Sequence, residues 1–220
     1  MSTRSSSCLL LFALCVLLAA VAPAAAQQVL YENGPINGTE DGWTINFGFA
    51  VSDTFTIAGG TSTLQGMSFG AWLLPGDTLE SVEVTITSSE FGGTLYFDQS
   101  VNLTATGCVA NQYGYDVCQE NGLFHGPTMN GGTYWVTLQN GVVNDGDPVY
   151  WDENAGVGCH SVGCPSLPSE NSLGTILSES FTMLGTVQTG TGGSTPEPGT
   201  LVLFGTGVLG VIGLMRRKLT

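Results

Sequence analysis

The chain has 220 residues and a formal net charge of −14 at pH 7, from 18 acidic residues and four basic ones. The basic residues all lie close to the two ends of the chain: Arg4, Arg216, Arg217 and Lys218. Since protein contacts with phosphate depend on Lys and Arg, we expect no nucleic-acid partner. A domain with this charge stays soluble and can collect divalent cations.

Residues 1–26 have the pattern of a secretory signal peptide. Arg4 gives a positive start, residues 8–22 form an apolar stretch, and small residues up to Ala26 end it. This order is typical of signals that are removed during export. We expect cleavage after Ala26, so that the exported chain begins at Gln27.

Residues 27–185 are predicted to form one all-β domain. No long stretch shows a helical period, whereas apolar and polar residues alternate in 81–87 and 133–138. Turn signals such as Pro75-Gly76-Asp77 separate the candidate strands. These strands are 29–31, 51–57, 63–74, 81–87, 94–97, 133–138, 149–152 and 178–184. About eight or nine strands in this length favour two packed antiparallel sheets, a β-sandwich of jelly-roll type with one core.

Four cysteines belong to the predicted domain: Cys108, Cys118, Cys159 and Cys164. Their even number in an exported chain indicates two disulfides, for which three pairings are possible. We favour the local one, in which Cys108 pairs with Cys118 and closes a short loop rich in Gly and Asn. Cys159 then pairs with Cys164 in the same way. The alternative for the second pair is a zinc site with His160, although the spacing matches no known zinc finger.

The densest acidic patch follows the strand expected at 133–138. Its carboxylates are a candidate Ca²⁺ site: Asp145, Asp147, Asp152 and Glu153. Hard oxygen ligands on a Gly-containing loop are what calcium binds. The spacing is not that of an EF-hand, and a solvated turn between two strands is the alternative interpretation.

No catalytic residues can be assigned from the sequence. Gly66-Met67-Ser68-Phe69-Gly70 has the G-x-S-x-G pattern of a nucleophile elbow, but that motif requires a strand-to-helix turn. Here it falls within an expected strand, so Ser68 is interpreted as an ordinary strand residue. A glycosidase needs two carboxylates at a set distance, and no motif selects such a pair. Aromatic side chains could instead stack on sugars, and we expect Tyr113 and Tyr115, inside the first disulfide loop, to be exposed.

The C-terminal tail, residues 195–220, follows a Gly- and Thr-rich linker at 186–194 that is expected to be flexible. The tail contains Pro196-Glu197-Pro198, an uncharged apolar span at 201–215, and the basic cluster Arg216-Arg217-Lys218. As a helix the span is roughly 22 Å long, compared with a hydrocarbon core of roughly 30 Å. It can cross a membrane if the basic side chains snorkel, and the positive-inside rule then places the domain outside.

The three parts of the tail, in this order, resemble a PEP-CTERM tail, the sorting signal of exported proteins in Gram-negative bacteria that make extracellular polysaccharide. The resemblance implies that an exosortase, a membrane protease, recognises the motif and removes the span. The protein would be anchored in the membrane before processing, and then reach the outer cell surface or the extracellular matrix. A plain anchor that is never cut is the alternative.

Such tails are also catalogued under the name ice-binding protein C-terminal domain. Ice-binding faces use long regular arrays of threonine, and the sequence has only short hints of one: Thr61, Thr63, Thr85 and Thr87. We therefore interpret that name as a label for the tail.

Parts of the body resemble the choice-of-anchor β-sandwich domains that often precede such tails. The resemblance rests on 51–57 with 64–70, on the Gly-Thr-Tyr-Trp strand at 132–138, and on 179–185. It implies a β-sandwich and a surface location, and no chemistry. We therefore expect a non-enzymatic surface or matrix protein that binds polysaccharide or Ca²⁺. A secreted hydrolase acting on matrix polysaccharide is the alternative.

Overall fold

The computed structural model describes residues 27–154 and 168–188, and the strands found there all pair in the antiparallel sense. In chain order they are β1 (Gln28–Asn33), β2 (Gly42–Thr44), β3 (Ala50–Leu73), β4 (Leu79–Ser89), β5 (Gly92–Ala110), β6 (Asp116–Leu123), β7 (Thr128–Val143), β8 (Tyr150–Asp152), β9 (Ser169–Glu170), β10 (Gly174–Thr175) and β11 (Phe181–Gln188). The described residues contain no helix. This confirms the prediction of an all-β, antiparallel domain.

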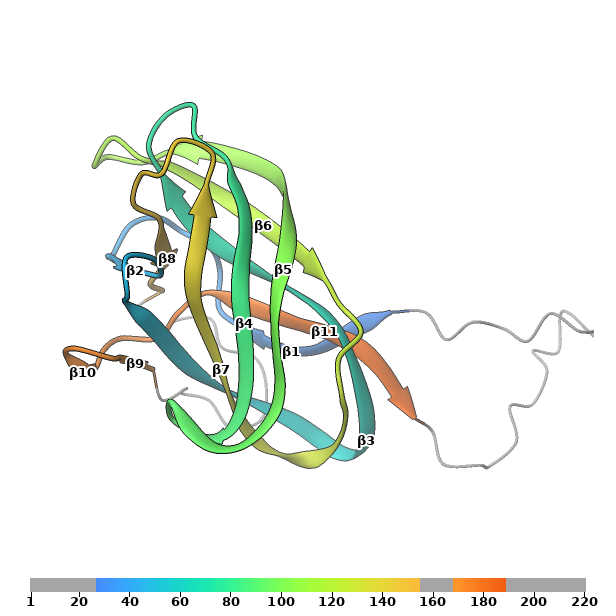
Figure 1. Cartoon of the computed structure of the whole chain (residues 1–220). Coiled ribbons are helices and arrows are strands. Elements are labelled where there is room, and N and C mark those ends of the chain that lie inside the picture. The colour runs from blue at the N-terminus through green and yellow to red at the C-terminus, as the bar shows by residue number, and fades with distance from the viewer. Residues whose placement is uncertain (1–26, 155–167, 189–220) are drawn as a thin grey trace, which may run out of the picture. The chain divides into compact units, whose positions relative to one another are not determined.

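Two long strands turn the sheet back on itself. The first part of β3 pairs with β7 and its last part with β6, while β5 pairs first with β4 and then with β6. Because β4 also pairs with β7, the strands β3, β6, β5, β4 and β7 form a closed ring of neighbours. Figure 1 shows β7, β4 and β5 as one layer, with β6, β11 and β1 crossing behind it, which gives a sandwich-like arrangement.

The remaining strands extend the second layer. β11 pairs with β3, and β1 pairs with β11, so that Gln28 lies opposite Gly185. The domain therefore begins and ends at neighbouring positions. β8 pairs with the end of β3 and with β2, and this corner carries the candidate site described below.

The core lies between the two layers. Alternating inward residues of β4, such as Val82 and Val84, have no exposed surface, and the same holds for Leu138 of β7. Large aromatic side chains fill the space between them, among them Phe55 and Trp151. Burial of each such side chain contributes about 1.5–3 kcal/mol to stability.

The strands differ from the sequence-based expectation in several places: the short strands β2, β9 and β10 were not expected, and β5 and β7 are longer than predicted. Residues 51–57 and 63–74 belong to one strand, β3, because the chain passes through Ala58-Gly59-Gly60 with a shift of register and no turn. β6 was not foreseen, since its inward positions include Glu120 and Gly122, so its apolar residues do not alternate. β11 runs to Gln188, three residues into the expected linker.

Several sequence-based predictions concern residues outside the described part. These are the signal peptide with its cleavage after Ala26, the pair Cys159 and Cys164, and the whole sorting tail with its apolar span at 201–215. Within the described residues, no helix has the length and apolar character needed to cross a membrane.

Candidate functional site

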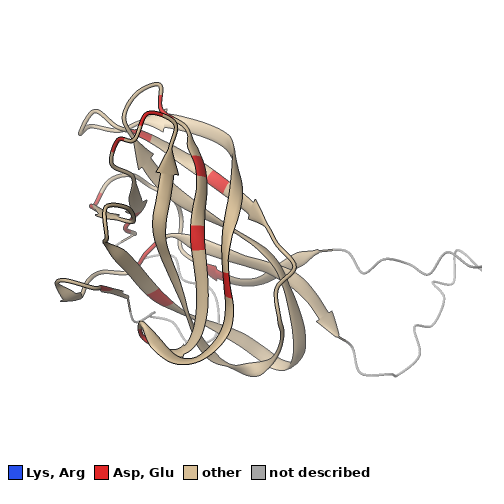
Figure 2. Cartoon of the chain, viewed as in Figure 1, with Lys and Arg blue, Asp and Glu red and all other residues tan. Residues whose placement is uncertain are grey.

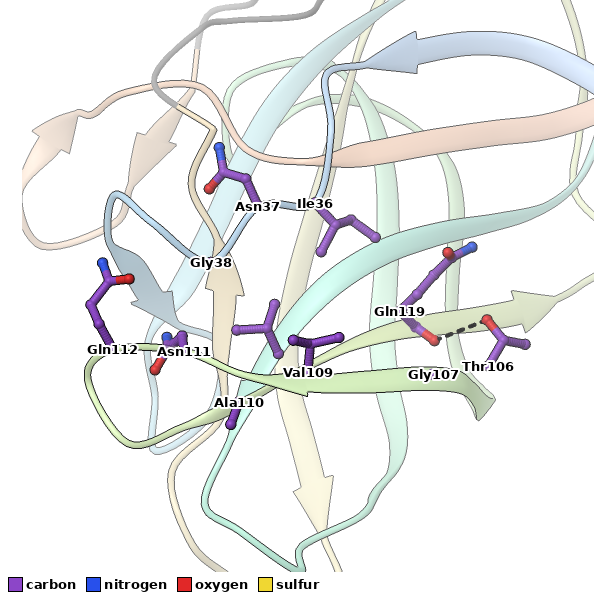
Figure 3. Close-up of a pocket in the computed structure, with 11 residues that line it drawn as sticks. Ile36, Asn37, Gly38, Thr106, Gly107, Val109, Ala110, Asn111, Gln112 and Gln119 are labelled. Carbon is purple, nitrogen blue, oxygen red and sulfur yellow. Dashed lines mark hydrogen bonds between the residues drawn. The ribbon is translucent and has the colours of Figure 1, made fainter.

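A groove of about 400 Å³ lies between the chain before β2 and the hairpin formed by β5 and β6. Figure 3 shows the side chains that line it. They are Ile36, Asn37, Gly38, Thr106, Gly107, Val109, Ala110, Asn111, Gln112, Val117 and Gln119. None of these eleven residues is charged, and five of them carry amide or hydroxyl groups. The groove thus offers neutral hydrogen-bonding groups next to small apolar side chains.

The buried carboxylate of Asp152 positions one wall of this groove. It accepts hydrogen bonds from the backbone N–H groups of Asn37 (2.9 Å) and Gly38 (3.0 Å). It also accepts bonds from Trp72 Nε1 (2.6 Å) and Ser180 Oγ (3.0 Å). Burial raises the pKa of Asp152, while its four donors act in the opposite direction.

Gly38 allows this wall to approach β6 closely. Its φ is +62°, and a Cβ built there would lie 2.6 Å from Cγ2 of Val117. A side chain at this position would have to displace Val117, so the groove wall needs glycine for both conformation and space.

The opposite wall is fixed by a disulfide between Cys108 and Cys118, at the end of the β5–β6 hairpin. Within the loop that it closes, Asn111 Oδ1 accepts hydrogen bonds from the backbone N–H groups of Tyr113 and Tyr115 (both 3.0 Å). The cross-link and this side-chain cap together hold the loop in one conformation.

Aromatic rings continue the surface beyond the groove. Tyr113 is 54% exposed and stacks on Trp72, with ring centroids 5.6 Å apart and an angle of 19° between the planes. Its hydroxyl donates to the carbonyl of Thr39 at 3.3 Å. Tyr115 is only partly exposed, because it packs against Trp72 and Tyr150. Of the two tyrosines expected at the surface, Tyr113 alone presents a largely open ring.

The four carboxylates predicted to form a Ca²⁺ site are divided between two places. Asp145 and Asp147 lie with Asp77, and one oxygen of each comes within 4.8 Å of the others. Burial and the neighbouring charges of Asp145 and Asp147 raise the pKa of Asp77. The sequence did not indicate Asp77 because it is far away along the chain. The two loops are joined by hydrogen bonds between Thr78 and Asn144.

Asp152 and Glu153, the other two predicted ligands, take no part in that group of three. Both are buried, and Glu153 Oε1 accepts hydrogen bonds from Trp43 Nε1 (3.3 Å) and the backbone N–H of Leu177 (3.0 Å). They belong to a set of acidic residues that are at most 4% exposed: Asp53, Glu120, Asp152, Glu153, Glu170 and Glu179. Figure 2 shows acidic positions on many strands and no basic residue on the described ribbon. The sequence held one signal of this burial: acidic residues at inward strand positions, in a stretch (27–215) that contains no Lys or Arg.

Ser68 lies in the middle of β3, with strand on both sides. It is buried and lies opposite Thr182 of β11 and Asn121 of β6. The G-x-S-x-G pattern therefore does not sit on a strand-to-helix turn here.

Fold and site together define an all-β, strongly acidic domain with a neutral groove. At the end of the chain, residues 194–218 match the family model of the PEP-CTERM protein-sorting motif. The chain thus carries this sorting motif, which implies an exported protein that an exosortase processes at the membrane. Among curated proteins, none is similar to the chain. The resemblance of the body to choice-of-anchor domains has only the all-β architecture in its support.

Proposed function

We propose that the protein is a non-enzymatic component of the outer cell surface or extracellular matrix, and that its domain binds polysaccharide in the groove beside the disulfide hairpin. The observation that carries this proposal is the neutral, amide-lined groove with the exposed ring of Tyr113 next to it. Sugars present hydroxyl groups to amides and apolar ring faces to aromatic side chains, so one site of this composition suits both.

The negative charge of the domain disfavours anionic polysaccharides as ligands. The domain contains no Lys or Arg, while all 18 acidic residues of the chain lie between residues 27 and 215. An anionic polymer would be repelled by the field of such a domain. A neutral or cationic glycan is therefore the expected ligand.

A glycan array with the exported protein tests this proposal. Tyr113→Ala should lower binding about fivefold, because stacking of a sugar on an aromatic ring contributes on the order of 1 kcal/mol. Tyr96→Ala is the matched control, since Tyr96 is also exposed but lies on β5 outside the disulfide-closed loop that borders the groove. Equal binding by the two variants, or no binding by the wild type, would contradict a glycan site here.

An assay for released reducing sugar, on the glycans that the protein binds, addresses the alternative, a secreted hydrolase acting on matrix polysaccharide. A binding protein leaves the bound glycan intact, whereas a hydrolase releases reducing sugar. Release that disappears when one carboxylate is changed to an amide would favour the hydrolase. No carboxylate lines the described groove, which supports binding without turnover.

The final location is tested by the intact mass of the protein from its native host. A mass that ends near Pro198, in the matrix or at the outer surface, would support sorting by exosortase. A mass that retains 201–220, in the inner membrane, would support a plain anchor.

A second candidate function is Ca²⁺ binding at Asp77, Asp145 and Asp147, favoured by the convergence of their oxygens within 4.8 Å. Calcium coordinates several oxygen ligands of this kind, often together with water. Calorimetry should then show a Ca²⁺-binding step that is absent when Asp145 and Asp147 are both changed to Asn, whatever heat other sites contribute.

A further inference from the structure

Two buried glutamates face each other where the chain after β8 meets the chain before β11. Glu153 and Glu179 are partners in an isolated antiparallel bridge, and they are 4% and 0% exposed. Side chains directly opposite each other in such a pair lie on the same face about 5 Å apart, and like charges there are destabilising. This arrangement needs a compensating positive charge or proton.

The two carboxylates differ in how they are satisfied. Glu153 Oε1 accepts hydrogen bonds from Trp43 Nε1 and the backbone N–H of Leu177. Both carboxylate oxygens of Glu179, in contrast, are buried and have no hydrogen-bond partner in the part of the chain that the structure describes. Buried polar groups are almost always paired. The Glu179 carboxylate is therefore free to coordinate a cation, since no group among the described residues satisfies it.

The surroundings of Glu179 add negative charge. Asp53 is close enough for its Oδ2 to accept the backbone N–H of Glu179 at 3.0 Å, and Asp152 lies next to Glu153 in the chain. Burial and the charges of nearby carboxylates, that of Asp53 foremost, raise the pKa of Glu179 well above its usual range. Since no Lys or Arg occurs between residues 27 and 215, the described part of the chain has no Lys or Arg to balance this group.

We propose that Glu153 and Glu179 bind a divalent cation of the calcium type. Calcium prefers carboxylate, main-chain carbonyl and water oxygens and accepts irregular geometry, so two carboxylates suffice as its charged ligands. Asp41 places Glu153 close to solvent, because Asp41 is exposed and its backbone carbonyl accepts the N–H of Glu153 at 2.9 Å. This site does not depend on the groove or on Asp77, Asp145 and Asp147, which lie in the loops after β3 and β7.

The bound cation would join two segments that are far apart in the sequence. Glu153 directly follows Asp152, and Glu179 directly precedes Ser180, which donates to Asp152. A cation between the two glutamates therefore reinforces the corner of the fold from which Asp152 holds the groove wall. We expect it to act as a structural ion.

The test is the thermal unfolding of the exported full-length protein with Ca²⁺ and with a chelator. Saturating Ca²⁺, at about 100 times its Kd, should raise the Tm of the wild type by roughly 5–10 °C. Glu179→Gln should abolish most of this rise and still fold, because it removes an unpaired buried charge. The double variant Asp145→Asn, Asp147→Asn should keep the rise, since it changes only the surface group.

A second measurement locates the ion. Tb³⁺ in the same site should show luminescence on excitation of tryptophan, because the Trp43 indole hydrogen-bonds to Glu153. The signal should fall at least fivefold in Trp43→Phe and in Glu179→Gln. The proposal is overturned if Glu179→Gln keeps the Ca²⁺-dependent rise in Tm. It is equally overturned if the wild type shows no rise and Glu179→Gln is simply more stable, which would mean that a proton neutralises Glu179.

Discussion

The carboxylate of Asp152 accepts a 2.6 Å hydrogen bond from the indole Nε1 of Trp72, and this contact connects the aromatic stack to the groove. Trp72 carries the exposed ring of Tyr113 on its face. The same carboxylate holds the backbone N–H groups of Asn37 and Gly38 in the groove wall. One buried acidic side chain therefore orders both parts of the candidate glycan site.

Asp152→Asn should destabilise the domain and weaken glycan binding. Each carboxylate oxygen of Asp152 accepts two hydrogen bonds, and the substitution replaces one oxygen by an NH₂ group. The two bonds to that oxygen are lost, and the NH₂ group then faces the donors that made them. We expect a loss of about 1–3 kcal/mol in the free energy of unfolding, measured with urea, because the removal of one charge near Glu179 offsets part of the cost. Asp98→Asn is the control, since Asp98 is exposed and should change stability by less than about 0.5 kcal/mol. Equal stability of the two variants would mean that the Asp152 network has no net effect.

A comparison of Gly38→Ala with Gly48→Ala should separate the cost of steric conflict from the cost of backbone strain. Gly38 and Gly48 both have positive φ, but a Cβ at Gly48 would have no atom within 4 Å, whereas one at Gly38 would meet Val117 at 2.6 Å. Gly48→Ala should therefore cost about 1 kcal/mol, from backbone conformation alone, and Gly38→Ala about 2–4 kcal/mol. Urea unfolding measures both. A difference of less than about 0.5 kcal/mol would show that the wall can yield at Val117.

Removal of the disulfide should loosen the loop that carries Tyr113. Cys108 and Cys118 are 10 residues apart, and closure of so short a loop in the unfolded chain corresponds to about 2–3 kcal/mol of stability. Replacement of both cysteines by serine should lower the free energy of unfolding by this amount and weaken glycan binding. The variant is preferable to chemical reduction, which would also act on the second disulfide predicted between Cys159 and Cys164. Unchanged binding would place the glycan away from this hairpin.

The all-β architecture could be predicted from alternation, but the path of the sheet could not. The strands at 81–87 and 133–138 were recognised because apolar residues fall on every second position, which is the direct mark of a half-buried strand. β6 escaped notice because Glu120 and Gly122 occupy inward positions. The continuity of β3 depends on pairing with β7 and β6, which no local pattern reveals.

The candidate site was predictable only in fragments. The loop with Tyr113 was singled out from its cysteines, and the acidic turn with Asp145 from its composition. Asp77 and Glu179 each join their partners through pairings that are distant in the chain. The role of Asp152 reversed, from an expected surface ligand to a buried acceptor, because Asp152 ends a strand that enters the core beside Trp151.

Glu120 gives the domain a pH dependence that the sequence did not suggest. Its side chain is 1% exposed, and both carboxyl oxygens lack a hydrogen-bond partner within residues 27–154 and 168–188. Burial raises its pKa to about 7 from an ordinary value of 4.5. The folded state therefore binds the proton more tightly than the unfolded state. Stability from this group is fully present below pH 4.5, falls as the pH rises toward 7, and does not change further above it. The total loss should be about 3 kcal/mol.

Urea unfolding of the wild type and of Glu120→Gln, at pH values from 4 to 8, tests this expectation. The amide cannot ionise, so the difference in free energy of unfolding between the two proteins isolates Glu120 from the repulsion among the other acidic residues. This difference should shift by about 3 kcal/mol in favour of the variant between pH 4.5 and 7 and stay level at both ends. A difference independent of pH would show that the Glu120 carboxylate finds a partner or water when it ionises.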